Sequence, residues 1–287
     1  MKRFVSTAAL VSLVTLGSAL AQADGRNPEE LTVALLPDEN ASELIQRNKP
    51  LEEYLEAELG REIQLQVLSD YSAMIQAMRF GRIDLGYFGP ISGMLAAAKG
   101  DVEFFAAPVV NGRAEYRGVI IGNVEQGIDE VEDARGETVA YGDPASTSSH
   151  LMPRAKLQDD YGMVAGEDYT REHTGAHDAV AKAVENGNAQ LGGLGEHIWT
   201  YLVEEDRIDT DKVQVVDHTP YYPQYPWVMQ SDLDEELKAS IREAFLELDD
   251  EEILGNFQAD GFVATDLSDY DIYRDMSETI GIDFEDL

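Results

Sequence analysis

The chain has 287 residues and a formal net charge of −35, because 56 Asp and Glu outnumber 21 Lys and Arg. Such an excess of carboxylates argues against binding to nucleic acid or to an anionic membrane surface, since both depend on clustered Lys and Arg. A hydrophobic content of 44% argues against disorder, and the length predicts two domains or lobes. The chain has no cysteine, which excludes disulfides, thiol nucleophiles and Cys-based metal sites.

Residues 1–23 are typical of a secretory signal peptide. The segment has a short cationic start and an apolar run at 4–20, and Ala19 and Ala21 form a small-x-small cleavage pattern. A transmembrane anchor is the alternative, although Ser and Thr interrupt the run. We therefore expect an exported, periplasmic protein without a lipid anchor, because no Cys lies near the cleavage point.

The acidity of the chain predicts adaptation to high salt, because it accompanies an ordinary content of core residues. The alternative is that exported proteins can simply be acidic, since net charge bears on solubility rather than on fold.

Strands and helices are predicted to alternate from the start of the mature chain. Short apolar or alternating runs favour strands, and apolar residues at helical spacing favour helices. The predicted strands are 31–36, 63–68 and 83–88, and the predicted helices are 42–59 and 72–80. This βαβαβ order predicts a parallel sheet flanked by helices.

The same alternation recurs in the rest of the chain, where a second α/β unit is expected. The predicted strands are 104–110, 116–122, 138–141, 190–194 and 213–216, and the predicted helices are 146–160, 179–186, 234–249 and 270–280.

No flexible linker separates the two units, which predicts discontinuous lobes joined by more than one crossing segment. We expect lobe 1 to comprise residues 24–114 and 219–287, and lobe 2 to comprise residues 115–218. Ligands of open α/β sheets bind outside the carboxyl ends of the strands, so the cleft between the lobes is the expected site.

Four hydroxyl residues in a row, 146–149, follow the strand 138–141 and precede a helix. A strand-to-helix junction of this kind brings together free backbone N–H groups, the positive end of a helix dipole and side-chain hydroxyls, which suits an anion. The alternative is an ordinary helix cap, for which one hydroxyl is enough.

The stretch Asp143-Pro144-Ala145-Ser146-Thr147-Ser148 resembles the D-P-x-S-T-S motif of the periplasmic phosphonate/phosphite-binding proteins of ABC importers. Further family motifs are similar to 70–80, 87–90 and 175–179, and the resemblance extends over nearly the whole mature chain.

This resemblance implies an α/β fold of the type II periplasmic binding proteins, with two lobes, each a mostly parallel sheet flanked by helices, and a ligand cleft between them. It implies the solute-binding component of an ABC importer, with a small phosphorus oxyanion as ligand (phosphite or an alkyl phosphonate) and a membrane permease as partner. It implies no enzymatic activity, no cofactor, no metal and a monomer.

The resemblance also implies the ligand-binding residues. They are Tyr71, Tyr87, Tyr116, Ser146, Thr147, Ser148, His177, Glu196 and Tyr225. In the family the matching His meets the oxyanion, and in relatives that bind aminoalkyl phosphonates the matching Glu receives the amine. Those relatives carry an Asp where this chain has Gln224 and Tyr225, which favours phosphite and small alkyl phosphonates as ligands.

Three other functions remain open from the residues alone. His173 and His177 have the spacing of metal ligands on a helix, but Gly175 lies between them and there is no H-E-x-x-H pattern. An exported hydrolase is a second possibility, although the chain lacks the G-x-S-x-G nucleophile elbow. The third is a periplasmic sensor, or a binder of another oxyanion such as phosphate.

Overall fold

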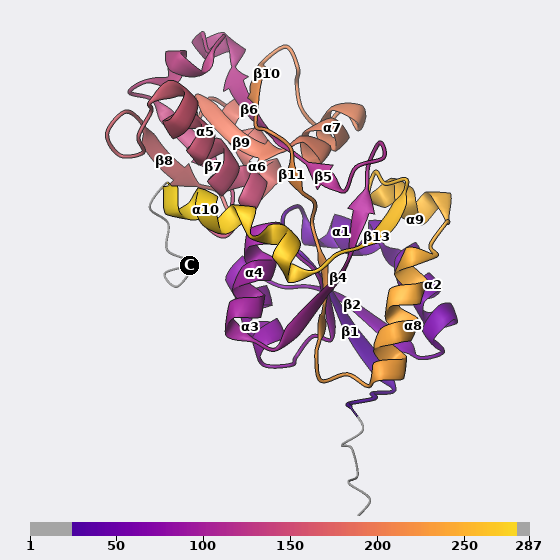
Figure 1. Ribbon diagram of the computed structural model, residues 1–287. Coiled ribbons are helices and arrows are strands. Elements are labelled where there is room, and N and C mark those ends of the chain that lie inside the picture. The colour runs from indigo at the N-terminus through magenta and orange to yellow at the C-terminus, as the bar shows by residue number, and fades with distance from the viewer. Residues whose placement is uncertain (1–24, 280–287) are drawn as a thin grey trace, which may run out of the picture.

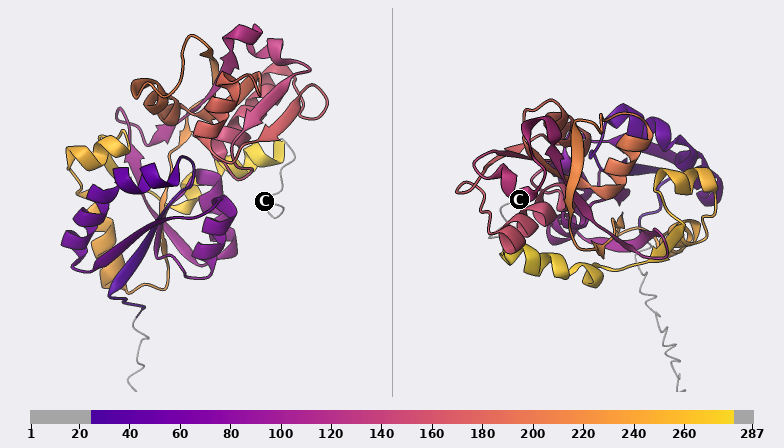
Figure 2. Two further views of the ribbon diagram at one scale, coloured as in Figure 1. Left: turned by 180° about the vertical axis from the view of Figure 1, so that it is seen from behind. Right: turned by 90° about the horizontal axis from the view of Figure 1, so that it is seen from above.

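The computed structural model describes residues 25–279, so the predicted signal peptide lies outside the described residues. The chain forms two α/β bodies, each built on its own sheet (Figure 1). Figure 2 shows the same two bodies from behind and from above. The prediction of a two-lobe α/β fold is confirmed.

The first sheet has six strands in the order β13-β4-β12-β3-β1-β2. Its strands are β1 (Glu30–Leu35), β2 (Glu62–Val67), β3 (Leu85–Tyr87), β4 (Val102–Val109), β12 (Trp227–Gln230) and β13 (Gly261–Ala264). The strands β2, β1 and β3 pair in parallel, whereas β12 and β13 run against their neighbours. The sheet is therefore mixed, with its parallel part formed by the N-terminal βαβαβ unit.

Helices cover both faces of the first sheet, and each face has its own apolar cluster. The helices α3 (Tyr71–Arg79) and α4 (Pro90–Lys99) lie on one side, and α2 (Lys49–Leu59) and α8 (Glu235–Leu246) lie on the other (Figure 1). The short helices α1 (Ala41–Arg47) and α9 (Glu251–Asn256) complete this body.

The second sheet has five strands in the order β10-β6-β9-β7-β8. Its strands are β6 (Gly118–Asn123), β7 (Thr138–Tyr141), β8 (Thr170–His173), β9 (Leu191–Gly195) and β10 (Val213–His218), and its helices are α5 (Met152–Tyr161), α6 (His177–Glu185) and α7 (Glu196–Glu204). The strand β6 is antiparallel to both of its neighbours, β10 and β9, whereas β9, β7 and β8 pair in parallel. The helices α6 and α7 pack on one face, and α5 packs on the other.

The predicted helix 42–59 is two helices in the structure, because the chain turns at Asn48. The Asn48 side chain donates a hydrogen bond to the Leu44 carbonyl and closes the end of α1. Pro50 then occupies the first turn of α2, where a missing N–H costs nothing. The apolar spacing continues across the break, so periodicity alone did not reveal it.

Several segments join the two bodies. The short strands β5 (Glu115–Tyr116) and β11 (Tyr222–Pro223) pair antiparallel between the sheets. The terminal helix α10 (Ile272–Thr279) lies against α5 of the second body (Figures 1 and 2). One apolar cluster includes Met74 and Phe88 of the first body and Leu151 and Met152 of the second. The two bodies therefore pack closely together, and the lobe limits given above stay a prediction.

Within residues 25–279, none of the helices combines the length and the apolar character that crossing a membrane requires.

Candidate functional site

The hydroxyl-rich segment lies in a tight turn after β7. The Asp143 carboxylate accepts a hydrogen bond from the Ala145 N–H (2.8 Å), and the Ser146 N–H bonds to the Asp143 carbonyl (2.9 Å). Thr147–Leu151 then form a π-helical turn that continues into α5. The predicted helix 146–160 therefore begins with a wider turn, which places successive side chains differently from a regular α-helix.

The four hydroxyls of this turn have four different surroundings. Ser146 caps the turn by accepting a hydrogen bond from the Ser149 N–H, and Ser149 Oγ donates to the Gly193 carbonyl of β9 (2.5 Å). Thr147 Oγ1 accepts a hydrogen bond from the Ile91 N–H at the start of α4, which joins the two bodies (3.0 Å). Ser148 Oγ is buried and has no hydrogen-bond partner among residues 25–279. A cap thus accounts for one hydroxyl but not for all four.

The imidazole of His177 faces Ser146, with Nε2 and Oγ 3.1 Å apart. The Gly195 N–H donates to His177 Nδ1 (3.0 Å), so in the neutral ring the hydrogen is carried by Nε2. Burial, with a smaller contribution from the neighbouring His197, lowers the pKa of His177 to about 3, so the ring is neutral at neutral pH. His177 is therefore a neutral N–H donor at this point of the cleft.

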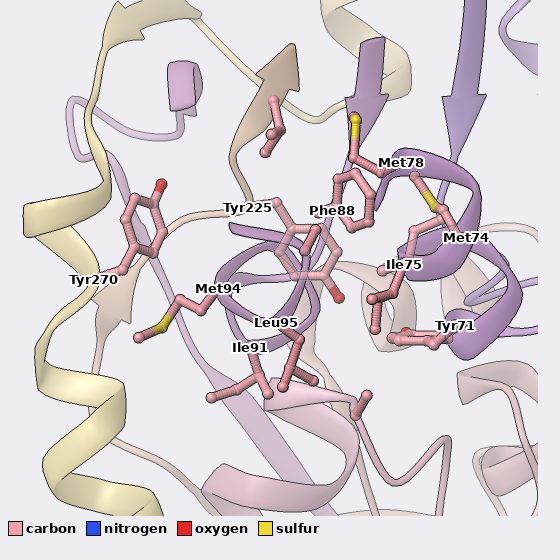
Figure 3. Close-up of a cluster of buried hydrophobic side chains, with 14 of the residues drawn as sticks. Tyr71, Met74, Ile75, Met78, Phe88, Ile91, Met94, Leu95, Tyr225 and Tyr270 are labelled. Carbon is pink, nitrogen blue, oxygen red and sulfur yellow. The ribbon is translucent and has the colours of Figure 1, made fainter. Parts of the chain in front are cut away.

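Three buried tyrosines come from the first body and from the junction. Tyr71 begins α3, Tyr116 lies in β5, and Tyr225 precedes β12. Figure 3 shows Tyr71 and Tyr225 with their hydroxyls turned toward the same space. The hydroxyls of Tyr71 and Tyr116 are buried without a hydrogen-bond partner in the part of the chain that the structure describes.

Ser148 lies between the hydroxyls of the turn and those of the buried tyrosines. Burial raises the pKa of Tyr116 and of Tyr225, and the neighbouring Ser148 hydroxyl opposes that rise in both. The three groups adjoin without reaching hydrogen-bond geometry. We call this group the hydroxyl cradle; its members are Tyr71, Tyr116, Ser146, Thr147, Ser148, His177 and Tyr225.

Tyr87 and Glu196 lie at the open side of the cradle. Together with Tyr116 they line a pocket of about 530 Å³, and the Tyr87 ring packs 5.5 Å from that of Tyr225. Glu196 is the first residue of α7 and accepts two hydrogen bonds from the Arg117 guanidinium. Of the nine residues expected from the sequence, seven therefore converge in the cradle, and these two lie at its mouth.

Sequence reasoning missed two features that border the cradle. Asp38 follows β1 and is only 7% exposed, and its backbone carbonyl accepts a hydrogen bond from the His177 N–H (2.9 Å). Helix α4 begins at Pro90, in a stretch for which no helix was predicted. Both have a local signal: Asp38 stands at the carboxyl end of a parallel strand, and a Gly-Pro pair can start a helix.

His150 and His173 form hydrogen bonds to backbone carbonyls of the protein. His150 is 3% exposed, and its Nδ1–H donates to the Pro144 carbonyl (2.8 Å). His173 Nδ1 bonds to the Gly142 carbonyl in the same way. Within residues 25–279 no group of His, Asp and Glu has the arrangement that would hold a metal ion.

The chain is similar to known proteins over most of its length. The sequence profile of the family described as the periplasmic substrate-binding protein of the phosphonate ABC transporter matches residues 33–270. The phosphate-import protein PhnD of Mycolicibacterium smegmatis is 30% identical over 175 residues, which cover 58% of this chain and 54% of that protein. The probable phosphite-binding protein PhnD1 of an ABC transporter in Prochlorococcus marinus is 27% identical, over 91% of this chain and 93% of that protein.

The fold is also found in solved structures. The structure of PhnD1 from Prochlorococcus marinus in complex with methylphosphonate superposes with a TM-score of 0.79 at 23% identity, covering 89% of this chain and 99% of that one. The match to the family profile extends from β1 to the segment before α10 and includes every residue of the cradle. This protein therefore belongs to the family of phosphonate-binding periplasmic proteins of ABC transporters.

Proposed function

We propose that this protein binds phosphite or a small alkyl phosphonate in the hydroxyl cradle and presents it to the membrane permease of an ABC importer. The ligand bridges the two bodies, so binding and closure occur together. No bond is made or broken in the ligand.

The observation that carries this proposal is the set of buried hydroxyls without partners. Leaving a buried donor unsatisfied costs about 1–3 kcal/mol, and native proteins rarely leave several in one place. Tyr71, Tyr116 and Ser148 are three such groups, and the His177 N–H lies beside them. The oxygens of one phosphorus oxyanion would accept hydrogen bonds from all of these donors.

The donors are neutral, which suits a ligand that is stripped of water. An unpaired guanidinium or ammonium in this position would itself be costly to bury whenever the cleft lacks a ligand. Neutral hydroxyl and imidazole donors carry no such cost, and hydrogen bonds from neutral donors to a charged acceptor are strong. The cradle can therefore open and close on its ligand without leaving an isolated cation inside.

The names of the relatives support the same ligand class. One is a probable phosphite-binding protein, and its solved structure contains methylphosphonate. Another is a phosphate-import protein, so phosphate is the first competitor to measure.

The hydrogen bonds of His177 support binding rather than hydrolysis. In a serine hydrolase the imidazole accepts the proton of the attacking serine. Here Nδ1 is occupied by the Gly195 N–H, so Nε2 already carries the hydrogen that faces Ser146. The pair is arranged to donate to an anion and not to activate a nucleophile.

Two further parts of the proposal concern the chain as a whole. Residues 1–23 are removed on export, which leaves a mature periplasmic protein. Lobe 1 comprises residues 24–114 and 219–287, and lobe 2 comprises residues 115–218.

Titration calorimetry tests the proposed ligand class. The mature protein is titrated with phosphite, methylphosphonate, 2-aminoethylphosphonate, phosphate and sulfate. We expect phosphite or methylphosphonate to bind most tightly. Failure of every phosphorus oxyanion to bind, or clearly tighter binding of sulfate, would contradict the proposal.

A further inference from the structure

Asp38 is buried beside His177, a member of the cradle. It follows the carboxyl end of β1 in the first body, and its backbone carbonyl accepts a hydrogen bond from the His177 N–H of the second body (2.9 Å). The His177 imidazole in turn faces Ser146. Asp38 is thus adjacent to the residues proposed to hold the oxyanion.

The field of the Asp38 carboxyl reaches into the cradle itself. Burial raises the pKa of Tyr71, Tyr87 and Tyr225, and in each case the next largest contribution is the negative charge of Asp38. These tyrosines come from α3, from β3 and from the segment before β12. The charge of this one buried carboxyl therefore acts on three phenols of the cradle and its mouth.

The charged groups around Asp38 do not neutralise it. Burial raises the pKa of its carboxyl well above the ordinary value, and the charges of Glu39 and, more weakly, Asp178 raise it further. Arg47 acts in the opposite direction, but its guanidinium is paired with Glu39 (2.6 Å). A buried carboxylate therefore has no cation of its own among these neighbours.

A carboxylate and an oxyanion that are buried side by side cannot both be fully ionised. We propose that Asp38 and the bound oxyanion share one proton, so that Asp38 makes the receptor selective for oxyanions that can carry a proton. This inference rests on the proposed function. The proton comes either from the ligand, as a P–OH group, or from solvent through the Asp38 carboxyl, and it lies between the two oxygens in the complex.

The proton balance gives a measurable consequence. When the bodies separate, Asp38 is in water and ionises in its ordinary range. Above the second ionisation of the ligand, both free partners are then without the shared proton, and each binding event takes one up from solution. Affinity should fall about tenfold per pH unit in that range.

The test is calorimetry with phosphite and methylphosphonate at about pH 9, in two buffers that differ in ionisation enthalpy. The dependence of the heat on the buffer reports the number of protons taken up. We expect an uptake of about one proton for the wild type and about none for Asp38→Asn, whose amide donates without exchanging a proton. If Asp38→Asn binds too weakly to measure, Asp38→Ser provides the same comparison with a smaller neutral donor.

The matched control is Asp178→Asn, which changes a neighbouring carboxyl outside the cradle and should keep the uptake of the wild type. Tight binding without proton uptake in the wild type would overturn the inference and leave the proposed function intact. So would tightest binding of 2-aminoethylphosphonate without uptake, because the ammonium would then occupy the place of the proton. An absence of binding by any phosphorus oxyanion would instead overturn the proposed function.

Discussion

Arg117 and Glu196 form a two-point ion pair at the mouth of the cradle: Arg117 Nε donates to Glu196 Oε2 at 2.7 Å, and Nη2 donates to Oε1. The hydrogen bonds that Arg117 donates to Glu196 raise the pKa of Arg117, so the guanidinium stays charged. The carboxylate that faces the pocket is thus already neutralised. It offers little attraction to a cationic group on a ligand.

This ion pair predicts the selectivity of the receptor toward amines. A hydrogen bond to a charged group is typically worth about 1.5–3 kcal/mol, or about one to two decades in affinity. We expect 2-aminoethylphosphonate to bind more weakly than phosphite or methylphosphonate by about that factor. Arg117→Gln should free Glu196. The difference in affinity between 2-aminoethylphosphonate and the smaller ligands should then narrow by about tenfold, measured by calorimetry.

The control for this prediction is Arg113→Gln. Arg113 lines the same pocket and its guanidinium lies over the same Tyr221 ring, at 5.3 Å against 5.0 Å for Arg117. Arg113→Gln should leave the order of the ligand affinities unchanged. Equal effects of the two substitutions would show that the general charge of the pocket, and not the pair with Glu196, determines selectivity.

Ser148 should contribute to affinity more than its size suggests. Its hydroxyl is buried and has no partner within residues 25–279, so Ser148→Ala removes a donor without breaking a hydrogen bond of the protein. We expect the affinity for the best ligand to fall by roughly ten- to a hundredfold, with no loss of thermal stability. Ser240→Ala, on the exposed side of α8, is the control. Normal binding by Ser148→Ala, Thr147→Ala and His177→Ala together would refute the assignment of the cradle.

Ligand binding should make the molecule more compact. Hydrogen bonds join the two bodies beside the apolar cluster that they share, for example Thr147 Oγ1 with the Ile91 N–H and Gln258 Nε2 with the His197 carbonyl (2.8 Å). Without a ligand, closure would leave the cradle hydroxyls buried and unpaired, which favours opening. Small-angle scattering of the protein should show a smaller radius of gyration with ligand than without it. An unchanged radius at saturating ligand would argue against a closing cleft.

Salt should stabilise the fold. A formal net charge of −35 produces self-repulsion that is screened at high ionic strength. Ion pairs such as Arg207 with Glu43 are weakened by the same salt, but partly exposed pairs contribute only about 0–1 kcal/mol each. The melting temperature should therefore rise from dilute to molar salt. A flat or falling curve would remove the argument for adaptation to high salt.

His150 should make the fold sensitive to acid. Burial lowers its pKa to about 3, with an opposing contribution from the Pro144 carbonyl, whereas the unfolded chain protonates it near pH 6.5. The neutral ring thus contributes stability that is complete above about pH 6.5 and is lost as the pH falls toward about 3. The stability difference between wild type and His150→Asn should shrink by about 1.4 kcal/mol per pH unit between about pH 6 and pH 4. A constant difference in denaturant titrations would contradict this.

Local patterns in the sequence determined the elements and the position of the hydroxyl turn. Apolar spacing predicts β1, α3 and α8 because the period of burial is a property of a few consecutive residues. The turn at 143–149 is equally local, because the hydrogen bonds that the Asp143 and Ser146 side chains accept each span only a few residues. The same patterns missed the break at Asn48, because apolar spacing continues across it.

Only the tertiary structure decided what each hydroxyl does and which charges meet. Thr147 bonds to Ile91, Arg117 neutralises Glu196, and Asp38 lies against His177, in each case across a long stretch of chain. Such contacts depend on how the two sheets pack against each other, which no short window of sequence encodes. Burial has the same origin, so the neutral state of His177 and the raised pKa of the Asp38 carboxyl follow from the closed cleft and not from the residues themselves.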